Sequence, residues 1–417
     1  MPYDVDAVRA HFPALHEGAA HFDGPGGSQV PDVVADAVAG TYRSAIANRG
    51  TITVAERRAD AIVVAARQAV ADLLGADPGG IVFGRSMTQV TYDLARTMAR
   101  TWGEGDEIVV TRLDHDANIR PWIQAAQSAG ATVRWAGFDR ETAELGVDDV
   151  TAELSDRTRL VAVTGASNLL GSRPPVRAIA DRVHEAGALL YVDGVHLTPH
   201  ASVDVAELGA DFYACSPYKF LGPHLGAVAA DPALLETLRP DKLVPMADTV
   251  PERFELGTLP YELLAGTTAA IDFLAGLAFG AGGDADPAVV GPSGPPGPSG
   301  VSRRERLVAS MRALEEHEAA LLQRLDAGLA KIDGVTLLGS SARRRTPTVL
   351  FTVAGLTPQA VYERLAEHGV NAPAGSFYAV EAAHWLGLGD AGAVRAGIGA
   401  YTNTADVDRL IDAVPCG

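Results

Sequence analysis

Lysine and cysteine are the scarce residues of this chain. Of its 417 residues only two are cysteines, Cys215 and Cys416, so disulfide bridges cannot support the fold and a reducing compartment is expected. Lysine occurs only at Lys219, Lys242 and Lys331, although lysine and arginine together number 34. Because arginine does not give up its proton, a reaction that needs a free primary amine has only these three candidates.

The chain also lacks long apolar runs and a positive net charge. No stretch reaches the roughly 18 consecutive apolar residues of a membrane span, and the opening sequence MPYDVDAVRAHFPALHEG has no apolar signal-peptide region. The formal net charge of −18 disfavours binding to nucleic acid or to an anionic membrane. These absences predict a cytoplasmic enzyme that acts on small molecules, with no nucleic-acid or membrane partner.

Short apolar runs alternate with helix-length segments between about residues 50 and 230. The runs that predict strands are residues 81–84, 107–112, 132–137, 159–165, 188–193, 211–215 and 226–230. Such alternation is typical of an α/β fold whose mostly parallel sheet, here of seven strands, is covered by helices on both faces. Thr53 and Glu56 form a capping-box pattern that predicts the start of one such helix.

The length of the chain favours two domains. One stretch near its middle is rich in proline, glycine and serine and is expected to form a surface loop rather than part of a core. The predicted division is an N-terminal segment, a large domain, this loop and a small C-terminal α+β domain, over residues 1–30, 31–280, 281–301 and 302–417.

Lys219 follows an apolar strand in the segment CSPYKFLGPH, residues 215–224. Its place between that strand and Phe220 predicts a desolvated amine, whose pKa is lowered and whose attack on a carbonyl group to form a Schiff base is favoured. Ser216, three residues earlier, is suited to bind a phosphate. A lysine that extends to solvent is the alternative, and the scarcity of lysine weighs against it.

Three other polar residues are candidates for the same site. Asp193 ends an apolar strand, where a buried carboxylate requires a cation such as a protonated pyridine nitrogen. Ser86 precedes a helix whose free N–H groups can bind an anion, and Arg395 has the planar fork that suits a carboxylate. Taken singly, each also fits a structural role, as a turn cap, a helix N-cap or half of a surface ion pair.

Eight motifs occur in order along the chain: FDGPGGSQVP, SMTQ, DHDANIRPW, GASNLLGS, YVDGVH, CSPYKFLGPH, ELGT and VRAGIGAYTN. Together they resemble the class V aminotransferase family of pyridoxal-5′-phosphate (PLP) enzymes, and within it the cysteine desulfurase-like branch. The resemblance extends from about Phe22 to Asp412, apart from residues 281–301. It implies PLP fold type I and a homodimer whose active sites are shared between the subunits.

The resemblance also implies a role for each matching residue. Lys219 would hold PLP as a Schiff base, Asp193 would pair with the pyridine nitrogen, and Arg395 would bind the substrate carboxylate. Further contacts are implied for Asn168 and His196 at the 3-oxygen side of the ring, for Met87, Thr88 and Ser216 at the phosphate, for His115 and Asp116 at the ring, and for the partner's Thr258. Asn168 would touch the substrate as well.

Two features depart from the desulfurase pattern. In the loop sequence GSFYA, Tyr378 stands where a desulfurase carries the cysteine that receives sulfur as a persulfide. The position of the ring-stacking histidine is taken by Asp116, and His115 lies one residue earlier. Cys215 ends an apolar strand and Cys416 is the penultimate residue, so neither is suited to replace the loop cysteine.

These residues predict an enzyme that uses PLP to remove Cα–H from a free α-amino acid, with Lys219 as proton carrier and Tyr378 as a further catalytic candidate. Elimination or replacement at Cβ or Cγ is favoured, including C–S cleavage without a persulfide. Epimerisation of the isopenicillin N epimerase kind, aminotransfer, true cysteine desulfuration and a non-catalytic scaffold are the alternatives. A nicotinamide dehydrogenase is disfavoured, because IVFGRSMTQV contains no G-x-G-x-x-G after the first strand.

Overall fold

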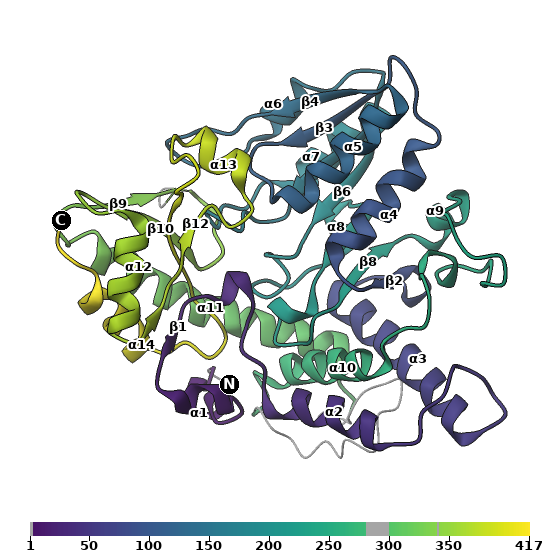
Figure 1. Ribbon diagram of the computed structural model, residues 1–417, viewed down its shortest axis with the longest axis horizontal. Coiled ribbons are helices and arrows are strands. Elements are labelled where there is room, and N and C mark those ends of the chain that lie inside the picture. Colours follow the sequence, from purple (N-terminus) through teal and green to yellow (C-terminus); the bar gives the residue numbers. More distant parts are fainter. Residues whose placement is uncertain (1–2, 281–299, 340–341) are drawn as a thin grey trace.

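The structure, a computed structural model, describes residues 3–280, 300–339 and 342–417 (Figure 1). Within these residues the strands form sheets of seven, four and two strands. The loop expected over residues 281–301 lies outside the described residues except for its last two positions. The seven-stranded sheet and its helices make up the larger part of the molecule, and the four-stranded sheet belongs to the smaller part beside it (Figure 1).

The seven-stranded sheet confirms the predicted α/β architecture. Its strands, in spatial order, are β2 (Ile81–Gly84), β8 (Gly226–Ala230), β7 (Phe212–Cys215), β6 (Leu189–Asp193), β5 (Thr158–Thr164), β3 (Glu107–Thr111) and β4 (Thr132–Ala136). β8 pairs antiparallel with both of its neighbours, and every other pairing in this sheet is parallel. All strands except β8 therefore end at the same edge of the sheet.

Helices bury both faces of this sheet, which explains why its strands are continuous apolar runs. Alternate strand residues point to opposite faces, so Val110 and Tyr191 pack with Trp122 while Val109 and Val192 join a different cluster. The helices of the described residues are α1 (Val5–Arg9), α2 (Asp32–Arg43), α3 (Val54–Leu74), α4 (Met87–Ala99), α5 (Arg120–Ala129), α6 (Val147–Thr151), α7 (Val176–Glu185), α8 (Val205–Leu208), α9 (Pro232–Thr237), α10 (Tyr261–Gly276), α11 (Arg303–Leu329), α12 (Pro358–Glu367), α13 (Val380–Trp385) and α14 (Thr404–Ala413). None of these helices is long and apolar enough to cross a membrane.

Local signals read from the sequence set where several helices begin. Thr53 and Glu56 form the expected capping box of α3, and the Ser86 hydroxyl accepts from Gln89 N at the start of α4. Ser302 and Glu305 form a second capping box, which begins α11. Each cap satisfies backbone N–H groups that the first turn of a helix leaves without partners.

The smaller part is an antiparallel sheet with helices packed on it. Its order is β12 (Ala374–Gly375), β13 (Ala393–Gly397), β10 (Thr348–Val353) and β9 (Val335–Leu338). The N-terminal segment joins this part, because β1 (Ala20–His21) pairs with β11 (Val370–Asn371) in a two-stranded sheet. The segment that follows β1 then runs toward the large sheet.

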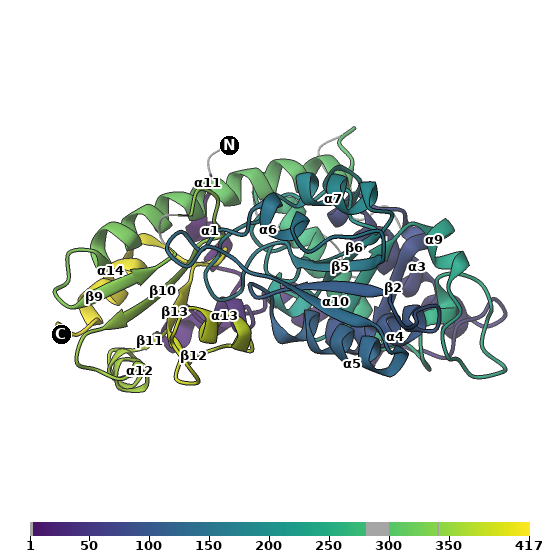
Figure 2. The same cartoon turned by 90° about the horizontal axis from the view of Figure 1, so that it is seen from above.

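Helix α11 connects the two parts (Figure 2). Leu307, Met311 and Leu314 in its first half pack in the core of the large sheet, whereas Leu325 and Leu329 pack against the small sheet. A domain boundary at residue 302 thus assigns to the small domain a helix whose first half is buried in the large one. The four-part division of the chain remains a proposal.

Candidate active site

Four chain segments meet where the parallel strands end. Asp193 is the last residue of β6, and Lys219 ends the 3₁₀ turn Pro217–Lys219 that follows β7. Asn168 lies after β5, and Ser86 begins α4 just after β2. Ligands of open parallel sheets bind beyond this edge, so the fold brings the predicted residues to the expected place.

Lys219 is a buried amine with a lowered pKa. Its side chain is 8 % exposed, and Nζ donates a hydrogen bond of 2.6 Å to Pro25 O. Burial, followed by the charge of Arg395, lowers the pKa of Lys219 to about 8, although Asp193 acts in the opposite direction. A lysine in this setting supplies a substantial fraction of unprotonated amine near neutral pH, as Schiff-base chemistry requires.

Asp193 is a buried carboxyl group that forms no ion pair with the residues that the structure describes. It accepts one hydrogen bond from Val195 N at 3.0 Å, and burial raises its pKa to about 6 despite that bond and the charge of Lys219. A protonated pyridine nitrogen would offset this cost of burial. The position therefore fits the nitrogen of a PLP ring.

Two neighbouring side chains have buried polar atoms with no hydrogen-bond partner in the described part of the chain. Nδ1 of His196 is one, while Nε2 of the same ring contacts the Thr348 and Thr346 hydroxyls at 2.9 and 3.1 Å. Oδ1 of Asn168 is the other. The amide nitrogen of the same side chain is used, because it donates to Phe377 O at 2.9 Å. Buried polar atoms of native proteins have partners, so these two indicate contacts with a bound group.

The predicted phosphate residues surround the start of α4 and the turn before Lys219. Ser216 and Met87 are buried, whereas Thr88 is exposed on the first turn of α4. Tyr218 lies beside them, with its ring stacked on His224 at 4.8 Å and the Lys219 Nζ 5.7 Å from its centre. The free N–H groups of the first turn of α4 together with the Ser216 hydroxyl can hold an anion.

Arg395 lies on β13 and reaches the site from the small sheet. It is 2 % exposed, and one terminal nitrogen donates to Asn168 O at 2.8 Å while Nε is buried without a partner. Burial lowers the pKa of Arg395 to about 9, so the guanidinium is still protonated at neutral pH. A buried cation with an unused N–H edge can hold a carboxylate through charge-assisted hydrogen bonds.

His115 and Asp116 follow β3 and face different partners. Burial and the charges of Lys219 and Arg395 lower the pKa of His115 to about 3, so this ring is neutral near pH 7. The Asp116 carboxylate instead lies 2.8 Å from Arg120. Of the two, His115 is the residue that the structure brings near Lys219, although the motif aligns Asp116 with the ring-stacking position.

Tyr378 and Thr258 lie on the surface of this chain. Tyr378 is 75 % exposed, and its ring stacks on His115 with a centroid distance of 5.6 Å. Thr258 is exposed in the segment before α10, and its predicted role concerns the site of a partner subunit.

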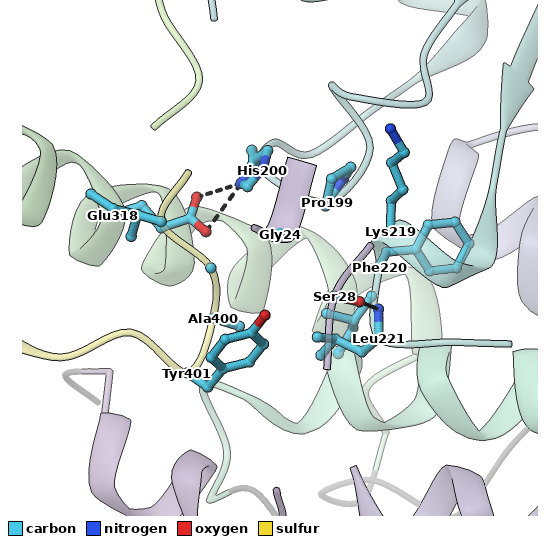
Figure 3. A pocket seen from close by; sticks show the side chains of 13 residues that line it. Gly24, Ser28, Pro199, His200, Lys219, Phe220, Leu221, Glu318, Ala400 and Tyr401 are labelled. Carbon is cyan, nitrogen blue, oxygen red and sulfur yellow. Dashed lines mark hydrogen bonds and ion pairs between the residues drawn. The ribbon is translucent and has the colours of Figure 1, made fainter. Parts of the chain in front are cut away.

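A small cavity lies beside Lys219 (Figure 3). Its volume is about 20 Å³, and its wall includes Gly24, Tyr401 and the ion pair of His200 and Glu318, whose Nδ1–Oε2 distance is 3.0 Å. This is room for about one water molecule. A space of this size does not hold an amino acid or a cofactor.

Three residues of the site were not predicted from the sequence: Pro25, Tyr218 and Phe377. Pro25 accepts the hydrogen bond of Lys219, and a Cβ added to Gly26 would lie 3.6 Å from Arg395, so the FDGPGGSQVP motif passes across the site. Its glycines and proline were the available signal, because such runs mark close backbone approaches. Tyr218 could have been noticed as the neighbour of Lys219, whereas Phe377 gave no sequence signal at all.

We expect PLP to attach to the apo enzyme at a rate that rises with pH through about 8 and then levels off. Only the unprotonated amine of Lys219 attacks the aldehyde, and an ordinary lysine would titrate near 10.4. Absorbance after mixing apo enzyme with PLP measures this rate. Since the charge of Arg395 lowers the pKa of Lys219, Arg395→Gln should move the midpoint to higher pH. A wild-type midpoint near 10 would contradict the desolvated site.

Comparison with known proteins identifies the family. The model of the family described as aminotransferase class-V matches residues 20–281 and 306–410. The chain belongs to the class V aminotransferase family. The expected PLP cofactor, fold and enzyme class are thereby confirmed for it.

The relatives of this class V aminotransferase include proteins named as desulfurases. It is 37 % identical over 416 residues to an uncharacterized protein of Mycobacterium tuberculosis, with 99 % of both chains covered. It is 31 % identical to probable cysteine desulfurase 2 of Mycobacterium leprae, over 99 % of this chain and 96 % of the other. The crystal structure of the cysteine desulfurase CsdA (S-sulfonic acid) of Escherichia coli superposes with a TM-score of 0.82 at 27 % identity, covering 99 % of this chain and 97 % of that one.

Proposed function

We propose that this PLP-dependent enzyme removes the Cα proton of a free α-amino acid and then breaks a bond at Cβ or Cγ, with C–S cleavage favoured. The observation that carries the proposal is the buried Lys219 amine, whose pKa is lowered by burial and by the charge of Arg395, with the Asp193 carboxyl group also near enough to act on it in the opposite direction. The site suits an α-amino acid bound to PLP. Arg395 is a cation for the carboxylate, Asp193 is a carboxyl group for the ring nitrogen, and Lys219 is an amine that can accept a proton.

Each residue then has a distinct task. Bound PLP withdraws electrons from Cα when its ring nitrogen is protonated, and Asp193 would stabilise that protonated nitrogen. Lys219, once free of the cofactor, would take the Cα proton on Nζ and could pass a proton to the departing group. Arg395 would hold the substrate carboxylate with its Nε edge, so that the substrate cannot rotate away from Lys219.

The remaining contacts would fix the cofactor. At the 3-oxygen of the ring, the unpartnered Oδ1 of Asn168 would accept a hydrogen bond, and Nδ1 of His196 would accept or donate one. Ser216, Thr88 and the N-terminus of α4, which begins at Met87, would hold the phosphate. The neutral ring of His115 is better placed than Asp116 to lie over the PLP ring, because Asp116 is engaged by Arg120.

The cysteines support lyase chemistry over persulfide transfer. Cys215 is fully buried, and burial followed by the charge of Asp193 raises its pKa to about 12, which suppresses the nucleophilic thiolate. Cys416 is exposed near the C-terminus. Tyr378, at the loop position of the desulfurase cysteine, cannot store sulfane sulfur, and we propose that it packs in the loop, shapes the substrate pocket or donates a proton.

Product analysis with L-cysteine tests the proposal. Elimination yields sulfide, pyruvate and ammonia, desulfuration yields L-alanine and a persulfide, and epimerisation yields D-cysteine. We expect pyruvate and sulfide in equal amounts from L-cysteine. In a panel of other amino acids, a leaving group at Cβ should be released together with pyruvate, and a leaving group at Cγ together with 2-oxobutyrate. Alanine as the main product, or a change of configuration without bond cleavage, would refute the lyase assignment.

The variant Cys215→Ser, Cys416→Ser should keep most of this activity, and no protein-bound persulfide should form during turnover. The physical reason is that neither thiol is both exposed and placed near the strand-end site. Alkylation followed by mass spectrometry detects a persulfide directly. Finding one on either cysteine would return the protein to the desulfurases.

We further propose a homodimer that completes each site with the partner's Thr258. Leu243, Val244 and Leu256 are exposed in the segment that leads to Thr258, and Val244 is 96 % exposed. Exposed apolar side chains gathered on one segment are typical of an interface.

We also propose a cytoplasmic location, which is supported by the small number of cysteines and their unpaired state.

A further inference from the structure

The loop between β12 and α13 contains an unusual backbone turn. Phe377 and Tyr378 have φ values of 53° and 59°, and the turn is closed by a hydrogen bond of 2.9 Å from Ala379 N to Ser376 O. Bulky residues rarely adopt positive φ, and two in succession require support from their surroundings. Strain of this kind at a predicted active site calls for a functional explanation.

The support comes from residues at the ends of the large sheet's strands. The Asn168 amide nitrogen donates to Phe377 O at 2.9 Å, and Asp116 N donates to Tyr378 O at 2.8 Å. Both carbonyl groups of the strained pair are therefore held by segments that follow β5 and β3. The conformation is tied to the site itself rather than to the small sheet alone.

The strained backbone directs the Phe377 ring against Arg395. The guanidinium carbon lies 3.7 Å from the centre of that ring. One terminal nitrogen of Arg395 donates to Asn168 O at 2.8 Å, so Asn168 holds both the arginine and the carbonyl group of Phe377. The three residues form a closed set in which each contacts the other two.

The hydrogen-bond donors of Arg395 show what this set leaves available. The flat face of a guanidinium has no N–H group, so the Phe377 ring covers Arg395 without using a donor. Nε of Arg395 is buried without a partner, and the second terminal nitrogen lies toward Gly26, at 3.6 Å from where a Cβ would be. The edge formed by these two nitrogens is the one that can accept a carboxylate in two parallel hydrogen bonds.

We infer that Phe377 is a positioning residue that fixes the plane of the Arg395 guanidinium and aims its free edge at the substrate carboxylate. This inference rests on the proposed function, in which Arg395 binds that carboxylate. Asn168 cannot fix the plane alone, because a single hydrogen bond leaves the fork free to rotate about it. The ring supplies the second constraint, and the strained turn is what brings the ring there.

Phe377→Leu in the holoenzyme tests the inference, because leucine retains an apolar side chain and the same backbone but has no π face. The probes are L-alanine and L-alaninamide, which differ in the carboxylate, and binding is followed through the cofactor absorption band. We expect the Kd of L-alanine to rise roughly 5- to 30-fold and that of L-alaninamide to change little. Phe377→Tyr should keep the wild-type values, because it keeps the aromatic ring. If Phe377→Leu folds poorly, Phe377→Met takes its place as the test variant and should give the same result.

A matched control loses a cation–π contact elsewhere. Arg67 lies over the ring of Phe83 at 5.5 Å, in the core next to β2. Phe83→Leu should lower the thermal midpoint and leave the ratio of the two Kd values unchanged. If Phe377→Leu also leaves the ratio of the L-alanine and L-alaninamide Kd values unchanged, for example by weakening both equally, the inference is wrong while the role of Arg395 stands. If the wild-type enzyme itself fails to prefer L-alanine, the proposed carboxylate site is wrong and the inference falls with it.

Discussion

Replacing Lys219 with alanine should leave a folded protein that no longer holds PLP covalently and turns over about two to four orders of magnitude more slowly. The amine is both the attachment point and the proposed carrier of the Cα proton. The fold should survive, because Lys219 makes a single hydrogen bond, to Pro25 O, and removing a buried charge relieves its desolvation. PLP should still bind without a covalent bond, held by Asp193 and the phosphate residues.

Borohydride reduction provides the measurement. Reduction fixes the cofactor to its lysine as a stable label. In wild-type enzyme this label should be recovered on the peptide that contains Lys219, and in Lys219→Ala it should be absent. Lys242→Ala is the matched control, since Lys242 binds Met246 O and lies 3.5 Å from Asp248 away from the strand ends. Recovery of the label on Lys242 or Lys331 would overturn the assignment.

Arg395→Ala should raise the Kd of an amino-acid substrate by roughly 10- to 150-fold while changing PLP affinity much less. The lost charge-assisted hydrogen bonds correspond to about 1.5–3 kcal/mol. The effect is expected to be selective, because the unused Nε edge of Arg395 can contact only the substrate. Separate titrations with PLP and with an amino acid measure the two affinities.

Arg324→Ala is a suitable control for the general effect of losing an arginine. Arg324 pairs with Asp408 on the surface at 2.6 Å, and exposed pairs of this kind contribute little. Its substrate affinity should match that of wild type. Equal losses of PLP and substrate affinity in Arg395→Ala would show that Arg395 is structural.

Much of the large domain was predictable because its strands are buried on both faces. Such strands are short continuous apolar runs, and the seven predicted runs coincide with the observed strands to within one or two residues. The caps Ser86 and Thr53 were also predictable, because capping depends on residues three positions apart. The direction of β8 was not, since an apolar run carries no information about the strand it pairs with.

The candidate site divides in the same way. Asp193 could be singled out as a polar residue at the end of a buried strand, and Lys219 as one of three lysines and a close follower of another such strand; both are buried. The choice between His115 and Asp116 could not be made from the motif, because it depends on whether Arg120 and Glu381 lie within reach of the carboxylate. Their positions depend on how α5 and α13 pack.

The sequence by itself therefore determined the family and the fold class, and it singled out Lys219 as the lysine that we propose binds the cofactor. These follow from local order along the chain, from apolar periodicity and from the scarcity of lysine. Only the tertiary structure decided which distant segments complete the site: Pro25 on Lys219, 194 positions away, and Phe377 against Arg395, held by Asn168 from 209 positions away. Contacts of that kind depend on the packing of the two sheets through α11, and no pattern of neighbouring residues specifies them.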